Sequence, residues 1–260
     1  MRGTLLSQLD LINKGEKIMP IILKQGQECS LEDLRNIPTP MGTRSYQPVP
    51  HYTLAVKIAS IASELLTGFA LDRSVYGTAR SGAQLFGLLT FKNSNTELGL
   101  SIAFTSSLDK SLSLKIATGG TVFICSNLCI TGKILKARKH TTTLLDDLDE
   151  MILTSVFRAR SSYTSALMDA QAMKAVPMGD EDAYHLLGSL FGHKVLSPRQ
   201  MPVALKEWHE PSHPDFEERN LWSLYNASTE ALKSCPPHSI MEKHIQLHRQ
   251  LLPGNARAQA

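Results

Sequence analysis

The chain has 260 residues, 42% of them apolar, which is enough to bury a hydrophobic core in one large domain or two small ones and excludes a wholly disordered protein. Its 27 Lys and Arg against 24 Asp and Glu give a net charge of +3, which by itself indicates no partner. The distribution of charge is more informative. Residues 1–145 carry a net charge of +7 and residues 146–260 one of −4, so the front half is basic and the back half acidic.

Cysteine usage and hydropathy indicate the compartment. Four cysteines are too few for a disulfide scaffold and fit a reducing cytoplasm. Charged residues between Asp10 and Lys17 interrupt the apolar run that a secretory signal needs, and no segment approaches 18 uninterrupted apolar residues. We therefore expect a cytoplasmic protein with no membrane partner.

The pattern along the chain predicts an α+β fold, with a helix followed by an antiparallel β-meander and then a mostly helical C-terminal part. Three regions are expected: an N-terminal arm over 1–45, a basic α+β core domain over 46–145 and an acidic helical region over 146–260. The arm is poorly patterned, so we interpret it as extended. Prolines between 37 and 50 mark the connector that ends it.

Apolar residues recur at the helical period from His51 to Leu66, and Gly68 ends that run. Alternating segments separated by turn residues then predict four strands of the meander, over 69–79, 83–92, 98–106 and 121–130. The segment 108–117 fits a strand or a helix. In the second strand the apolar residues crowd together, which indicates a strand covered on both faces or in contact with another subunit.

Helical patterning resumes at Asp146 and extends to about Val176, with acidic residues in the first turn where the helix dipole favours them. Asp180 is the predicted N-cap of the next helix. Prolines after residue 197 divide the remainder into short helices.

A dense basic segment over 132–141 follows the last predicted strand and is the most distinctive local feature. Its cationic residues are Lys133, Lys136, Arg138 and Lys139, followed by His140. Lys and Arg at this density neutralise phosphates and release counterions, so a nucleic-acid backbone is the natural partner. The alternative is a solvated connection whose cations meet the acidic turn at 146–150.

A second polar cluster consists of Asp109, Lys110 and Ser111, followed by Lys115 and by two glycines at 119 and 120. Neither of the glycine-rich nucleotide-binding patterns is present, so a tight turn with an Asp/Ser cap is favoured over a nucleotide site. Lys110, Lys115 and Arg80 are weaker candidates for phosphate contacts. Tyr76 or Phe86 would stack bases if exposed.

Other residues give little support for chemistry. Cys125 and Cys129 are expected in the core, whereas Asn127 needs a partner from the backbone or from a ligand. The histidine pairs 244/248 and 209/213 lack a third metal ligand, so exposed helix histidines are the default. Trp208, Trp222 and Tyr225 favour core or partner contact. No catalytic constellation is recognised, so we expect neither an enzyme nor a cofactor or metal.

Four of these stretches together resemble the phage/plasmid-like family named domain of unknown function 932. They are the Asp109, Lys110 and Ser111 cluster, the strand sequence GGTVFICSN at 119–127, the basic RKHT at 138–141, and LWSLYNA at 221–227. Family members usually carry an Asn or His before the Asp-Lys-Ser, where this chain has Ser107 and Leu108. The resemblance implies a mobile-element context and, with it, the cytoplasm of a bacterial host cell. The order of elements is also similar to that of single-strand annealing proteins of the Rad type and of Redβ/RecT and Erf relatives.

Two functions follow as hypotheses. The first is a nucleic-acid-binding protein of a phage or plasmid that binds or anneals single-stranded DNA through the basic segment and self-associates into a ring or filament. The second is a protein-interaction module, such as an inhibitor of a host defence or restriction system, whose acidic helical half contacts a host protein.

Overall fold

The computed structural model describes residues 27–93, 97–122, 128–129, 136–138, 144–236 and 239–257. Within them, seven strands form one sheet in which all neighbours are antiparallel. The strands are β1 (Gln27–Cys29), β2 (Ala70–Ala79), β3 (Gln84–Lys92), β4 (Leu98–Ser107), β5 (Leu114–Val122), β6 (Leu128–Cys129) and β7 (Lys136–Arg138). β1 to β6 follow one another in chain order, and β7 also pairs with β5. The predicted α+β fold with an antiparallel meander is confirmed.

The fourth strand begins earlier than predicted. It was expected over 121–130, whereas β5 begins at Leu114, inside the segment that had been compatible with a strand or a helix. The turn at Asp109 to Ser111 reverses the chain directly after β4, so the next strand starts early. Gly119 and Gly120 lie inside β5, and their low strand propensity hid it.

The centre of the sheet is buried on both faces. Leu85, Phe86, Leu88 and Leu89 alternate between the two faces of β3, and each is at most 1% exposed. The crowded apolar pattern therefore reflects a strand covered on both sides, as predicted.

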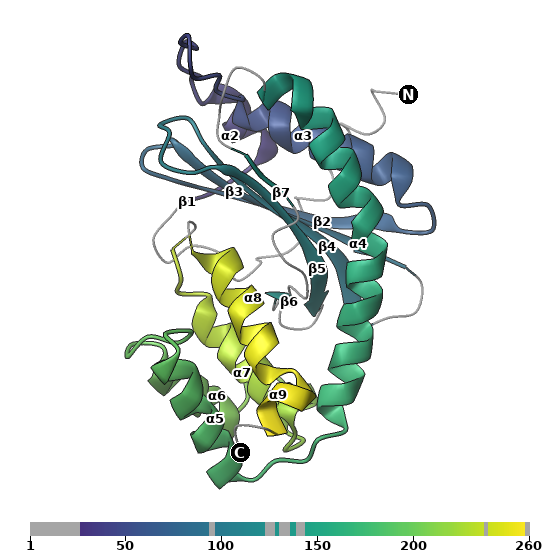
Figure 1. Ribbon diagram of the computed structural model, residues 1–260, viewed down its shortest axis with the longest axis vertical. Coiled ribbons are helices and arrows are strands. Elements are labelled where there is room, and N and C mark those ends of the chain that lie inside the picture. Colours follow the sequence, from purple (N-terminus) through teal and green to yellow (C-terminus); the bar gives the residue numbers. More distant parts are fainter. Residues whose placement is uncertain are drawn as a thin grey trace.

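Two helices cover one face of this sheet, α3 (His51–Leu65) and α4 (Leu144–Lys174) (Figure 1). α4 lies along β4 and β5 and touches α3. Thr118 Oγ1 of β5 donates to Ser162 Oγ at 2.9 Å, and Tyr163 Oη donates to the Leu98 carbonyl oxygen at 2.9 Å. These bonds fix the long helix to two strands of the sheet.

Part of the expected arm is regular structure, which corrects its interpretation as extended. β1 pairs with β2, and α2 (Leu31–Asn36) follows directly. Ser30 Oγ accepts from the Asp33 backbone N–H at 3.1 Å, and the Asp33 carboxylate accepts from the Ser30 backbone N–H at 2.8 Å. This reciprocal capping box is readable in the sequence as Ser followed three residues later by Asp.

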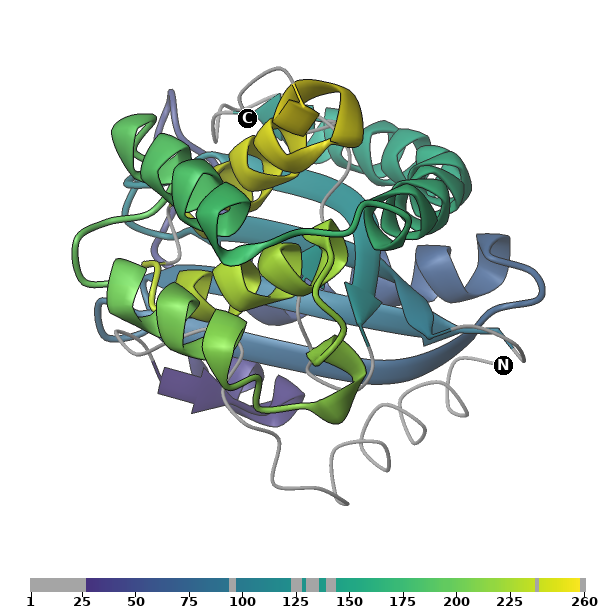
Figure 2. The same ribbon diagram turned by 90° about the horizontal axis from the view of Figure 1, so that it is seen from below.

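The acidic half forms the helices α5 (Asp180–Gly192), α6 (Met201–His209), α7 (Leu221–Leu232) and α8 (Ile240–Leu251), with the short η1 (Pro214–Phe216) and α9 (Pro253–Arg257). These helices lie below the sheet in Figure 1 and in front of it in the view from below in Figure 2. One cluster of buried apolar side chains extends from Leu31 to Leu251, through both sheet and helices.

Aromatic side chains anchor this helical part, as predicted. Trp208, Trp222 and Tyr225 are each no more than 2% exposed, and the rings of Trp222 and Tyr225 stack at a centroid distance of 5.3 Å. The predicted N-cap at Asp180 was off by one residue, because Gly179 is the cap. Among the described residues, no helix is long and apolar enough to cross a membrane.

Candidate nucleic-acid interface

Two tight turns meet at one end of the sheet. Antiparallel pairing of β2, β3 and β4 brings the β2–β3 and β4–β5 turns to the same end, where Gln84 pairs with both Ala79 and Ser107. The Leu108 backbone N–H donates to the Ala83 carbonyl oxygen at 2.7 Å, and Gln84 Nε2 donates to Ser111 Oγ at 2.8 Å. The two turns therefore form one connected surface.

Left-handed backbone conformations present two cations at this end. Arg80 in the first turn has φ 52° and Lys110 in the second has φ 65°, a region that non-glycine residues rarely occupy. The predicted tight turn at Asp109 to Ser111 is confirmed, since the Ser111 backbone N–H donates to Asp109 Oδ1 at 2.9 Å.

The third cationic segment reaches the same end through β7. Its register places Arg138 opposite Leu114, the first residue of β5, and Lys136 opposite Ile116. We call the set Arg80, Lys110, Lys136 and Arg138 the basic sheet end. The sheet thus brings together cations from three separate parts of the sequence.

Arg80 is bound only loosely to its own chain. Its Nη1 lies 3.4 Å from Asp109 Oδ2, and 64% of the side chain is exposed. Burial raises the pKa of the Asp109 carboxyl, but hydrogen bonds from Ser111, Arg80 and Ser107 outweigh it, so the pKa lies below its ordinary value. An exposed ion pair of this kind contributes little stability, so Arg80 can turn to a phosphate at low cost.

Lys110 is held in place by an aromatic ring. Its Nζ lies 4.7 Å from the centroid of the Tyr46 ring, and Tyr46 itself is buried. This cation–π contact fixes the lysine at the sheet end while the lysine stays exposed. It also brings the turn closed by Thr43 and Tyr46 to this end, with exposed Arg44 inside it. Arg44 was missed from the sequence because nothing in the loop pattern links it to the sheet.

Lys115 occupies a different environment from the other candidates. It lies one residue inside β5, and its Nζ forms an ion pair with Glu242 Oε1 on α8. The side chain is mostly buried, so its charge is already matched within the chain. Lys115 therefore connects the sheet to the helical half.

The remaining basic candidates fall partly outside the described residues. Lys133, Lys139 and His140 lie outside them, and so does Asn127. Lys136 and Arg138 are strand residues of β7, and their backbone register places them opposite Ile116 and Leu114 of β5.

The two aromatic residues that would stack bases if exposed are buried. Tyr76 and Phe86 are at most 1% exposed, and burial raises the pKa of the Tyr76 hydroxyl to about 12. Tyr76 packs against Phe104 at a centroid distance of 6.5 Å, inside the sheet face under α3 and α4. Both side chains belong to the core, which corrects their proposed contact with nucleic acid.

The histidine pair on α8 was also misjudged. His244 and His248 are 2% and 3% exposed, not solvated. His248 Nε2 lies 3.0 Å from Asp169 Oδ2 on α4, and its ring packs edge-on against Tyr225. The four-residue spacing placed both histidines on one helix face, but only the fold shows that this face is buried. His209 is exposed, as expected, on α6.

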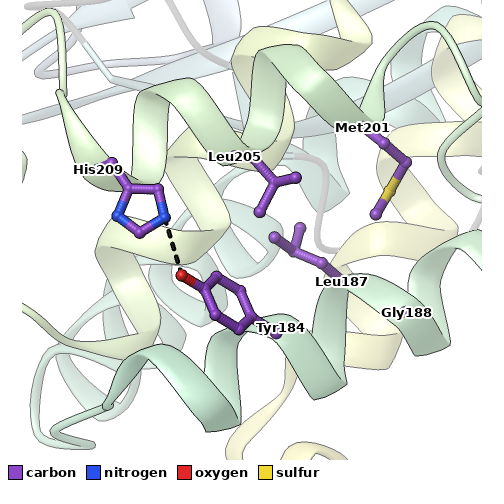
Figure 3. Close-up of a pocket in the computed structure, with 6 residues that line it drawn as sticks. All are labelled: Tyr184, Leu187, Gly188, Met201, Leu205 and His209. Carbon is purple, nitrogen blue, oxygen red and sulfur yellow. Dashed lines mark hydrogen bonds between the residues drawn. The ribbon is translucent and has the colours of Figure 1, made fainter.

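A shallow apolar groove lies at the far end of the molecule, between α5 and α6 (Figure 3). Its volume is about 470 Å³, and Leu187, Met201 and Leu205 point into it. At its rim, Tyr184 Oη and His209 Nε2 are 3.1 Å apart. No sequence pattern indicated this groove, since its apolar residues have the spacing of ordinary core positions.

No family model, curated protein or solved structure matches this chain. The resemblance to the phage/plasmid-like family therefore stays a prediction, and function is argued from the site itself.

Proposed function

We propose that the protein binds single-stranded DNA at the basic sheet end, with Arg80, Lys110 and β7 contacting phosphates. The observation that carries this proposal is the convergence of three cationic segments, distant in sequence, on one end of one sheet. Because these residues lie on one sheet, a phosphate backbone can contact several of them at once.

The proposed mode is contact with the backbone. Because Tyr76 and Phe86 are buried, they offer no base-stacking platform, and sequence preference is expected to be weak. The turns at Arg80 and Lys110 position charges, and the hydroxyl of exposed Ser81 beside them supplies a hydrogen-bond donor for phosphate oxygens. The two turns fix where the phosphate backbone lies on the protein, and the basic segment over 132–141 extends the contact.

The test compares salt dependence among charge variants. Fluorescence anisotropy with a labelled single-stranded oligonucleotide measures the slope of log K against log salt. Each lost phosphate contact lowers the slope by about 0.7 for a single strand, so the double variant Arg80→Ala, Lys110→Ala is expected to lower it by about 1.4. The triple variant Lys136→Ala, Arg138→Ala, Lys139→Ala is expected to lower it further.

The matched control is Lys206→Ala, which removes an exposed cation from α6 at the acidic end. It is expected to leave the slope unchanged. Circular dichroism and thermal melts show whether each variant keeps the fold. Slopes that are unchanged in both the double and the triple variant would overturn the proposal.

A second candidate, a protein-interaction module such as an inhibitor of a host defence system, is supported by a different surface. Exposed carboxylates gather around the start of α5 and around η1, where Asp180 meets Arg219 at 2.7 Å. They are Glu181, Asp182, Glu210, Asp215, Glu217 and Glu218. The negative charge of this end would repel a nucleic acid, and a protein is its expected partner. Absence of DNA binding even at low salt would therefore favour the second candidate.

A further inference from the structure

The groove between α5 and α6 is open and mainly apolar, with room for a flexible apolar side chain. Leu187 forms its buried floor, and Met201 and Leu205 face it from α6 (Figure 3). Gly188 lies in its wall, and a Cβ at this position would meet nothing within 4 Å. The glycine thus leaves open space that a larger residue would fill.

The chain also carries an exposed apolar side chain of matching chemistry. Met41, in the loop between α2 and α3, is 93% exposed. Burial of a Met side chain removes apolar surface from water, and its flexible thioether adapts to irregular apolar surfaces. The ring of Tyr184 at the groove rim offers a favourable contact for the sulfur.

The exposed Met41 side chain, here called the knob, and the groove cannot meet within one molecule. α2 and α3, which flank Met41, lie at one end of the long axis, and α5 and α6 lie at the other (Figure 1). Contact between them therefore needs a second copy of the chain.

Charges around the two surfaces are complementary. Exposed Arg44 follows Met41 by three residues, in the turn closed by Thr43 and Tyr46, and Lys110 lies over the Tyr46 ring. At the groove, Glu181 precedes Tyr184 by one helical turn, and Glu210 directly follows His209; both carboxylates are exposed. Opposite charges at the two ends favour head-to-tail approach and disfavour contact between two like ends.

We propose that the groove between α5 and α6 binds the Met41 loop of a second copy of this chain, so that the protein self-associates head to tail. The contact is heterologous: each molecule uses its knob on one neighbour and its groove on another, and the contact can repeat. This inference does not depend on DNA binding, because the proposed function uses neither Met41 nor the groove.

The test uses one variant for each side of the contact. Met41→Ser removes the knob, and Gly188→Gln fills the groove with a helix-compatible polar side chain. Sedimentation velocity at low salt and about 100 µM protein is expected to show association of the unaltered protein and monomers for each variant. The first control is Met168→Ser, which makes the same substitution at another exposed methionine, 65% exposed on α4. The second is Gly192→Gln, at a glycine of α5 where an added Cβ would also meet nothing within 4 Å. Both controls are expected to associate like the parent.

Mixing the two variants separates this arrangement from a symmetric one. Met41→Ser keeps an intact groove and Gly188→Gln keeps an intact knob, so their equimolar mixture is expected to stop at a 1:1 dimer. A monomeric parent protein, or variants that associate like the parent, would overturn the proposal, and so would a mixture that stays monomeric. Because both variants keep the basic sheet end, their DNA salt slopes report separately on the proposed function.

Discussion

Lys115 of β5 and Glu242 of α8 form an ion pair that connects the sheet to the helical half of the chain. Lys115 comes from the basic half of the sequence and Glu242 from the acidic half. The opposite charges of the two halves therefore meet inside the molecule at this ion pair. Because its charge is paired with Glu242, Lys115 is expected to contribute to stability, whereas Arg80 and Lys110 are expected to contact phosphates.

Lys115→Ala is therefore expected to change stability and not DNA binding. Loss of a partly buried charge-assisted hydrogen bond leaves Glu242 without this partner and costs about 1 kcal/mol. For a chain of this size that corresponds to a fall of roughly 2 °C in Tm. The salt slope of DNA binding should stay at the parent value, whereas a drop as large as that of Arg80→Ala would place Lys115 among the phosphate contacts.

Gly87 is expected to tolerate no side chain. A Cβ at this position would lie 2.1 Å from Cζ of Phe104, whose ring covers the glycine in the sheet. Gly87→Ala forces the ring to move and is expected to cost about 1–3 kcal/mol in denaturant unfolding. Gly188→Ala, which meets no atom within 4 Å and lies inside α5, is the control and should stabilise by up to about 1 kcal/mol. Equal effects of both changes would contradict the packing described here.

The contact between His248 and Asp169 is expected to hold α8 against α4. Asp169→Ala removes the acceptor from a buried ring and should lower the free energy of unfolding by about 1–3 kcal/mol. Asp169→Asn keeps an oxygen acceptor at the same position, so most of the stability should be retained. Urea titrations of both variants make the comparison, and an equal loss for Asn and Ala would show that the hydrogen bond itself is unimportant.

The contacts of Asp180 predict a pH dependence. A hydrogen bond from Trp208 Nε1 at 2.9 Å is the main cause that lowers the pKa of this carboxyl, and Arg219 adds to it. A carboxyl whose pKa is lower in the folded state stabilises the fold above its unfolded value of about 3.9, and this stabilisation is lost as the pH falls through the folded value.

Asp180→Asn should therefore lower Tm at pH 6, and the difference from the parent should shrink toward pH 3. Thermal melts followed by tryptophan fluorescence measure this difference directly. A Tm difference that is constant between pH 6 and pH 3 would show that the charge of Asp180 does not contribute.

Local patterns predicted those elements whose signal lies within one segment. The helical period from His51 to Leu66 gave α3, and the acidic first turn followed by an apolar stripe gave α4. The boundaries of β5 failed because glycines and threonines mask alternation there. The capping box at Ser30 was readable but was overlooked within a weakly patterned arm.

The candidate site was only partly predictable, since it depends on register. Arg80 and Lys110 could be named from the sequence, but their meeting with β7 follows from strand pairings that span the whole sheet. The contact between His248 and Asp169 joins residues 79 positions apart, which no local spacing reveals. Burial of Tyr76 and Phe86 likewise depends on the helices that cover them.

The most direct test of the central claim is anisotropy of the full chain with single-stranded and duplex oligonucleotides at about 50 and about 200 mM salt. Four phosphate contacts at the basic sheet end predict that affinity for the single strand falls roughly 50-fold between these salt concentrations. Absence of binding at about 50 mM salt, or binding that is insensitive to salt, would contradict the account.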